Sequence, residues 1–347
     1  MIPGEPTESR VNPSMIRARP LTPPPAMGKL SSMEQPTILG SCFARARVGS
    51  DLGSFRLTGL LGEGAQAAVY VAEAPLVGGR VALKVMHPEH ADSAAARARF
   101  LREPRIANTV AEVHEGAVPI FLLGIAPSGA PFFDAPFFVM PLLHGRSLEA
   151  RLADSCLSWG GAAALGMAVA DILVAADQLG VVHRDIKPGN LFLTRDRKVK
   201  LLDFGIGKAN ALPGGALTAA GALLGTVDFM APEAAQGRDI GGRGDVFSLA
   251  ATMVTAMAGR PMRGEGPPLE LLVRAATQAP PPVATIVPGV PRPVAQLLDA
   301  ALALDPRDRP SARAFQTALA AACNRARTGE AETWPGGRGA RRGRAFA

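Results

Sequence analysis

The most informative part of the chain reads His183-Arg184-Asp185-Ile186-Lys187-Pro188-Gly189-Asn190, and Asp203-Phe204-Gly205 begins 18 residues after Asp185. Transfer of a phosphoryl group needs a carboxylate that orients the attacking hydroxyl, oxygen ligands for Mg²⁺, and a cation near the transferred phosphate. Asp185 fits the first role, Asn190 with Asp203 the second, and Lys187 the third. Both motifs in this order and spacing are very improbable by chance.

Upstream, a glycine-containing segment reads Gly62-Glu63-Gly64-Ala65-Gln66-Ala67-Ala68-Val69 between two predicted strands. Its glycines allow backbone amides to approach phosphate oxygens closely, as a phosphate-covering hairpin requires. By itself this signal is weak, because such a pair is as often an ordinary turn, and Ala67 stands where a third glycine is usual. The strand-turn-strand setting argues against a dinucleotide fold, which needs strand-turn-helix.

The next predicted strand contains Val81-Ala82-Leu83-Lys84. A lysine among apolar neighbours points to one face of the sheet, where it can hold α- and β-phosphates, although a solvated surface lysine is the alternative. Glu103 lies 19 residues further on, inside a predicted helix. It is the candidate partner that fixes the geometry of Lys84.

Hydrophobic patterning divides the folded part of the chain into a strand-rich and a helix-rich half. Strands are expected at 55–61, 68–72, 81–86, 120–123 and 136–142, with one helix at 93–107. Helices are expected at 147–155, 162–179, 246–257, 269–277, 293–303 and 312–324.

The two ends of the chain differ from the middle. Residues 1–50 are rich in proline, and residues 325–347 are rich in Gly and Arg, so both are expected to be disordered tails. The formal net charge of +7 belongs to these tails, because residues 51–324 hold 25 basic and 25 acidic residues. A nucleic-acid partner is therefore not expected for the folded part, and weak binding of nucleic acid or of an acidic partner is an alternative only for the basic C-terminal tail.

The three cysteines are widely spaced and form no C-x-x-C pair, which argues against a zinc site or a disulfide framework. The chain opens without the apolar stretch of a signal peptide. The low-polarity run 156–170 is rich in Gly and Ala and predicts a buried helix rather than a membrane span. A cytoplasmic location is expected.

With these motifs, the sequence resembles the bacterial, eukaryotic-like Ser/Thr protein kinases over roughly residues 55–322. The resemblance implies an α+β fold with two lobes. The N-lobe, about 51–143, is an antiparallel sheet with one key helix, and the C-lobe, about 144–324, is mainly helical. It also implies ATP and Mg²⁺ as cofactors and Ser/Thr-containing proteins as substrates.

The resemblance extends to further landmarks: Ala231-Pro232-Glu233, Asp245, and Arg309 within Asp305-Pro306-Arg307-Asp308-Arg309-Pro310. It implies that Glu233 pairs with Arg309 and that Asp245 holds the backbone of the His183–Arg184 turn. Met140 falls at the gatekeeper position, followed by the adenine-contacting hinge 141–143. Nucleotide contacts are implied for Leu61, Gly62, Glu63, Gly64, Ala65, Val69, Ala82, Lys84, Met140, Leu142 and Leu193.

Regulation is also implied. Lys187 with Gly225-Thr226 resembles the Ser/Thr-specific branch, in which the lysine contacts the threonine. Arg184 resembles the arginine that binds a phosphate on the activation segment. Thr218 and Thr226 are the only hydroxyl residues between Gly205 and Ala231, and Thr226 is needed unmodified beside Lys187, so Thr218 is the candidate phosphorylation site, with an ordinary loop threonine as the alternative. Autophosphorylation by a second copy of the chain, through self-association, follows from this.

Two other functions remain as alternatives: a pseudokinase scaffold and a small-molecule phosphotransferase. The first usually lacks the lysine or a catalytic aspartate, whereas Lys84, Asp185, Asn190 and Asp203 are all present. The second is not expected to keep Ala231-Pro232-Glu233 after a long activation segment. The histidines of His87-Pro88-Glu89-His90 are expected in a loop and not at a metal site.

Overall fold

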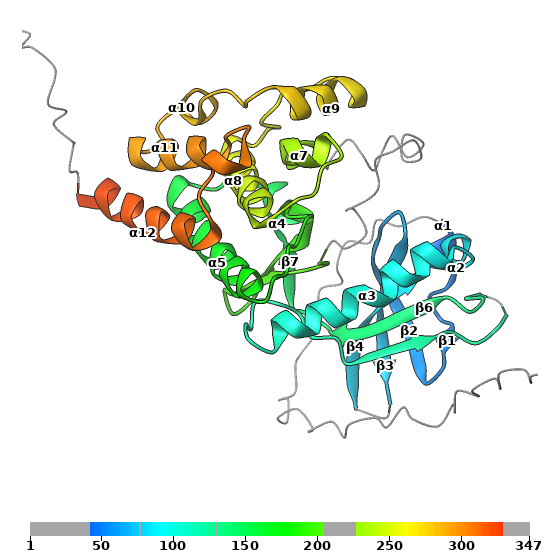
Figure 1. Ribbon diagram of the computed structural model, residues 1–347. Coiled ribbons are helices and arrows are strands. Elements are labelled where there is room, and N and C mark those ends of the chain that lie inside the picture. The colour runs from blue at the N-terminus through cyan, green and yellow to red at the C-terminus, as the bar shows by residue number, and fades with distance from the viewer. Residues whose placement is uncertain (1–41, 76–77, 130, 205–226, 329–347) are drawn as a thin grey trace, which may run out of the picture.

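The computed structural model describes residues 42–75, 78–129, 131–204 and 227–328 (Figure 1). The first half contains α1 (Cys42–Ala46), β1 (Asp51–Leu52), β2 (Phe55–Glu63), β3 (Ala67–Ala74), β4 (Gly79–Met86), α2 (Pro88–Ala91), α3 (Ala94–Ala111), β5 (Leu122–Ile125) and β6 (Pro136–Pro141). The second half contains β7 (Gly145–Ser147), α4 (Leu148–Leu152), α5 (Trp159–Gln178), the 3-10 helix η1 (Pro188–Asn190), β8 (Leu191–Thr194), β9 (Val199–Leu201), α7 (Pro232–Ala235), α8 (Gly242–Ala258), α9 (Pro268–Thr277), α10 (Val283–Ile286), α11 (Arg292–Ala301), η3 (Pro306–Asp308) and α12 (Ala312–Thr328).

The N-lobe is an antiparallel sheet in the order β1-β2-β3-β4-β6-β5. Apolar residues of β2, β3, β4 and β6 form a core that α3 covers through Ala96 and Phe100 (Figure 1). The Phe100 ring packs on Phe138 of β6 with a centroid distance of 5.1 Å. Ser93 caps α3 by accepting a hydrogen bond from the amide of Ala96, which fixes where this helix begins.

The N-terminal boundary of the folded unit differs from the expectation. Residues 42–50 form α1 and a turn, with Ala44 and Arg47 fully buried. The Tyr70 hydroxyl donates to the Ala44 carbonyl at 3.2 Å, and the Gly49 amide donates to the Leu57 carbonyl at 2.8 Å. The expected disordered tail is therefore wrong for 42–50, because prolines upstream lowered the apparent apolar content of the whole stretch. Residues 1–41 lie outside the described residues.

The C-lobe is built around α5, which α8 and α12 cover (Figure 1). Gly166 permits this close packing, since a Cβ there would lie 2.5 Å from the Met253 sulfur and 3.1 Å from Leu319. By length and composition α5 matches a membrane span, but 56% of its apolar window is buried inside the lobe. At the far end α12 continues to Thr328, so the expected boundary at 324 is a few residues too early.

The small sheet β7-β8-β9 joins the catalytic segments to the C-lobe. The Leu201 amide donates to the Gly116 carbonyl at 2.8 Å, and the Leu202 amide donates to the Asn190 carbonyl at 2.9 Å. These bonds place the chain after β9 beside the turn that contains Asn190. An antiparallel sheet lobe with one covering helix, followed by a mainly helical lobe, is the fold class that the sequence predicted.

Candidate active site

Lys84 lies at the centre of the site and contacts both lobes. Its Nζ lies 2.8 Å from Glu103 Oε1 on α3 and 2.8 Å from Asp203 Oδ1 beyond β9. The side chain of Lys84 is only 12% exposed, whereas that of Asp203 is 45% exposed. The expected Lys84–Glu103 contact is present, and the contact with Asp203, 119 residues away in sequence, was not anticipated.

The three charges shift one another's pKa values. Burial alone would lower the pKa of Lys84, but the carboxylates of Asp203 and Glu103 outweigh it and raise that pKa. Burial raises the pKa of Glu103 to about 7, against the lowering effect of Lys84. For Asp203, the ammonium of Lys84 outweighs burial and lowers the pKa. Asp203 is thus the carboxylate that stays ionised, as a metal ligand must.

The glycine-containing hairpin between β2 and β3 is closed by a hydrogen bond from the Gly64 amide to the Ala67 carbonyl at 2.8 Å. Neither Gly62 nor Gly64 has a positive φ, and a Cβ would meet nothing within 4 Å at Gly62 and only the Ala67 carbonyl oxygen, at 3.6 Å, at Gly64. The fold itself therefore does not require glycine at either position. Close approach of a ligand to the backbone is the remaining physical reason for them.

The side chain of Asp185 is held by its own turn. Its Oδ2 accepts a hydrogen bond from Asn190 Nδ2 at 2.9 Å and lies 3.2 Å from Lys187 Nζ. Asn190 Nδ2 also donates to the Asp185 carbonyl at 2.7 Å. With both amide hydrogens so engaged, the Asn190 side chain offers its oxygen as a ligand.

Asp245 at the start of α8 supports the turn before Asp185. Its two carboxylate oxygens accept the amides of His183 at 2.6 Å and Arg184 at 2.7 Å. Arg184 has a φ of +69°, a strained conformation for a residue with a side chain, and these bonds stabilise it. Burial raises the pKa of Asp245 to about 7, although both amides lower it. His183 is fully buried, its ring packs in a tilted arrangement against Phe204 with a centroid distance of 4.8 Å, and it contacts the Leu202 carbonyl, so it is a core residue.

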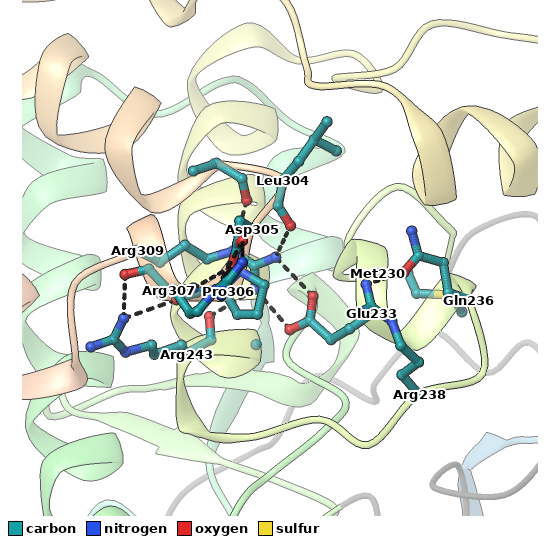
Figure 2. A network of polar contacts seen from close by, with 12 residues as sticks. Met230, Glu233, Gln236, Arg238, Arg243, Leu304, Asp305, Pro306, Arg307 and Arg309 are labelled. Carbon is teal, nitrogen blue, oxygen red and sulfur yellow. Dashed lines mark hydrogen bonds and ion pairs between the residues drawn. The ribbon is translucent and has the colours of Figure 1, made fainter.

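Figure 2 shows a second buried support, in which Arg309 and Glu233 form a bidentate ion pair with both N–O distances at 2.8 Å. Their side chains are 0% and 4% exposed. The guanidinium groups of Arg309 and Arg263 lie 4.9 and 5.3 Å from the centre of the Phe247 ring. Arg263 also donates to the carbonyl of Val227, a role that sequence reasoning missed.

The described residues fit a magnesium site. Among them no three His, Cys, Asp or Glu side chains gather as a complete metal cage. Mg²⁺ is usually held by one or two protein oxygens together with phosphates and water, rather than by such a cage. Asp203, ionised and half exposed, and Asn190, with its oxygen available, form such a partial donor set.

Of the other expected site residues, some are described by the structure and some lie outside the described residues. Ala82 is buried and pairs with Met140 across β4 and β6, and Val69 pairs with Lys84 across β3 and β4. Leu61, Leu142 and Leu193 are partly buried. Gly205, Thr218 and Gly225-Thr226 lie outside the described residues, so the activation segment and its contact with Lys187 stay predictions.

A sheet lobe and a helical lobe that meet at a lysine–aspartate contact, next to an Asp-Lys-Asn turn, define the protein kinase class. The chain belongs to this family, because the protein kinase domain matches residues 55–319. This confirms the family that the sequence resembled.

Bacterial kinases are among the most similar relatives. The serine/threonine-protein kinase Pkn1 of Myxococcus xanthus is 37% identical over 84% of this chain and 41% of its own length. PknD of Mycobacterium tuberculosis is 35% identical over 76% of this chain and 38% of its own length. The chain thus spans about two fifths of these curated relatives. The crystal structure of the Mycobacterium tuberculosis PknI kinase domain matches with a TM-score of 0.61 and 28% identity, over 79% of this chain and 98% of that one.

Proposed function

We propose that this chain transfers the γ-phosphate of ATP to Ser and Thr hydroxyls of protein substrates, with Mg²⁺ as cofactor. The observation that carries the proposal is the double contact of Lys84 with Glu103 and Asp203, 2.8 Å each. It brings the nucleotide-holding cation and the metal-binding carboxylate together across the two lobes. The relatives named as serine/threonine-protein kinases support the same substrate class.

Each residue has a role that its contacts support. Lys84, oriented by Glu103, holds the α- and β-phosphates. Asp185 accepts a hydrogen bond from the attacking hydroxyl, and its position is kept by Asn190 and Lys187. Lys187 places a positive charge near the transferred phosphate. Asp203 and Asn190 would hold Mg²⁺, which neutralises charge on the phosphates when bound.

Purified chain incubated with labelled ATP, Mg²⁺ and a mixture of unstructured Ser/Thr-containing proteins tests the proposal. We expect label on Ser and Thr in the wild type and loss of label in Asp185→Asn, which keeps the size of the side chain. An equal level of labelling in the two proteins, or labelling of a small molecule only, contradicts the assignment.

We propose further that activity is raised by phosphorylation of Thr218 by a second copy of the chain. The phosphate would bring about −1.5 to −2 charges, which the Arg184 guanidinium can bind. Peptide mapping after incubation with ATP is expected to find phosphate on Thr218. A rate of phosphorylation that rises with protein concentration indicates transfer between copies, and a fully active Thr218→Ala protein contradicts the switch.

A further inference from the structure

Two histidines contact the tip of the glycine-containing hairpin. Nε2 of His87 lies 2.9 Å from the Gly64 carbonyl oxygen, and Nε2 of His90 lies 2.8 Å from the Ala65 carbonyl oxygen. The backbone amide of His87 donates to the Gln66 carbonyl at 2.9 Å. The carbonyls of three consecutive residues, 64–66, are therefore all bound by one short segment. This segment was expected to be a loop and not a metal site.

The segment 87–90, which we call the histidine segment, supports the hairpin. Pro88 starts α2, and His87 precedes it in an extended conformation with φ −69° and ψ 137°. The His87 side chain is 5% exposed, and its Nε2 is 3.6 Å from Glu63 Oε1 of the same hairpin. A carbonyl oxygen can only accept a hydrogen bond, so Nε2 of each ring must carry the hydrogen. The rings thus act as fixed donors.

The bonds to the carbonyls also fix the direction of the backbone amides that follow them, because the peptide group is planar. In a planar trans peptide the carbonyl of one residue and the amide of the next point in opposite directions. When the carbonyls of residues 64–66 are bound by the histidine segment, the amides of Ala65, Gln66 and Ala67 must point away from it. Side chains alternate in direction along β4, which ends at Met86, and His87 continues the strand in an extended conformation, so Lys84 and His87, three residues apart, point to opposite faces. The amide of Ala65, opposite the carbonyl that the His87 ring binds, consequently points toward the face of Lys84, whereas the amide of Ala67, opposite a bond between two backbones, lies in the plane of the sheet.

We propose that His87 and His90 are positioning residues for the nucleotide: they orient the amides of Ala65 and Gln66 toward the phosphates of ATP. This inference rests on the proposed function. The histidines touch no reacting atom and act through the hairpin. By holding the hairpin in its binding conformation before the nucleotide arrives, they lower the ordering cost of binding.

Leucine variants test the inference, since leucine removes the donor and keeps an apolar side chain. In His90→Leu and His87→Leu we expect the Kd for ADP and the KM for ATP to rise about twofold to tenfold each, the range that one hydrogen bond supplies. The kcat is expected to change less. His90→Gln and His87→Gln, whose side-chain amide can donate to the same carbonyl, are expected to restore most of the affinity.

Glu89→Gln is the matched control, because Glu89 is exposed on the same short helix. Thermal unfolding verifies that each variant is folded, and His90, which is only half buried, keeps the test valid if His87→Leu does not fold. Hydrogen exchange of the nucleotide-free protein supplies an independent measurement. Backbone amides of residues 63–67 are expected to exchange faster in the leucine variants than in the wild type and Glu89→Gln.

The outcomes separate this inference from the proposed function. A wild type that binds no nucleotide and phosphorylates nothing overturns both. If the wild type binds and phosphorylates, unchanged Kd, KM and hairpin exchange in both leucine variants overturn the inference alone. A fall in unfolding temperature without a change in nucleotide affinity also overturns it, because the histidines would then be merely structural.

Discussion

The hairpin of the N-lobe and the catalytic turn of the C-lobe are held by opposite kinds of side chain. At the hairpin, imidazole donors of His87 and His90 bind backbone carbonyls. At the catalytic turn, the carboxylate of Asp245 binds two backbone amides. In our proposal the first arrangement directs backbone amides toward the phosphates of ATP, and the second holds the strained turn before Asp185. Local backbone geometry at both places is therefore decided by a side chain from another element.

The two regions also differ in burial. Asp245 is 2% exposed and lies beneath the turn, whereas the hairpin tip at Gly64 and Ala65 is exposed. Loss of a bond in the buried region leaves an unsatisfied polar group, while water can replace a lost bond at the exposed tip. The comparison predicts that catalytic-turn variants lose stability and rate together, and that hairpin variants lose mainly nucleotide affinity.

The largest effect is expected at the contact that joins the two lobes. Lys84→Met removes the cation between Glu103 and Asp203 while keeping the length of the side chain. We expect the rate of phosphoryl transfer to fall about 10²-fold to 10⁴-fold, because a charge that stabilises the transition state is lost. Asp203→Ala is expected to do the same. Circular dichroism verifies folding, and near wild-type turnover in either variant contradicts the site.

Glu233→Gln tests the buried ion pair between Glu233 and Arg309 in the C-lobe. The substitution keeps the shape but leaves the buried guanidinium of Arg309 without its counter-charge. We expect the free energy of unfolding to fall by about 3–5 kcal/mol, measured by urea denaturation. Glu270→Gln, at an exposed carboxylate that pairs with Arg274, is the control and is expected to cost under about 1 kcal/mol. Similar losses in the two variants contradict the assigned difference in burial.

Asp245→Asn weakens the support of the turn itself. An Asn side chain can accept only one of the two amides of His183 and Arg184 with its oxygen, so one buried donor loses its partner. The expected cost is about 1–3 kcal/mol of unfolding free energy, with a fall in kcat and little change in the KM for ATP. A variant with raised KM and unchanged kcat assigns Asp245 to the nucleotide instead.

Acidification is expected to change the stability and the activity of the chain in opposite directions. The pKa values of Glu103 and Asp245 are both raised to about 7 from ordinary values of 4.5 and 3.8. The folded chain therefore holds more protons than the unfolded chain between about pH 4 and 7, and these two groups add stability as the pH falls through 7. Because Glu103 must be ionised to hold Lys84, kcat/KM is expected to fall over the same range. Glu103→Gln is expected to lack its share of this pH dependence.

The smallest effect is expected from the loss of α1, which packs on the sheet of the N-lobe. Removal of residues 1–50 deletes the packing of Ala44 and Arg47 and the Tyr70 hydrogen bond, whereas removal of residues 1–41 keeps them. We expect the longer deletion to be less stable than the shorter one by about 1–2 kcal/mol in urea denaturation. Equal stability of the two truncated proteins indicates that α1 contributes nothing to the N-lobe.

The sequence by itself determined the family and the residues of the catalytic turn, since Asp185, Lys187 and Asn190 lie within six residues and one tight turn brings their side chains into contact. Hydrophobic periodicity also located most strands and helices, because alternation and helical spacing report directly which face is buried. Expected bounds differed from the observed ones by a few residues, where capping and packing decide the end of a helix.

Only the tertiary structure decided the contacts between distant segments. The Lys84–Asp203 pair, the docking of α1 on β2 and β3, and the histidine donors at the hairpin join residues whose separation in sequence carries no signal. Periodicity describes one element at a time, whereas these contacts depend on how elements pack against one another. The sequence pattern of a histidine beside a proline does not indicate what the ring contacts. The role of His87 can be recognised only from the fold, which brings a carbonyl oxygen within 3 Å of its ring.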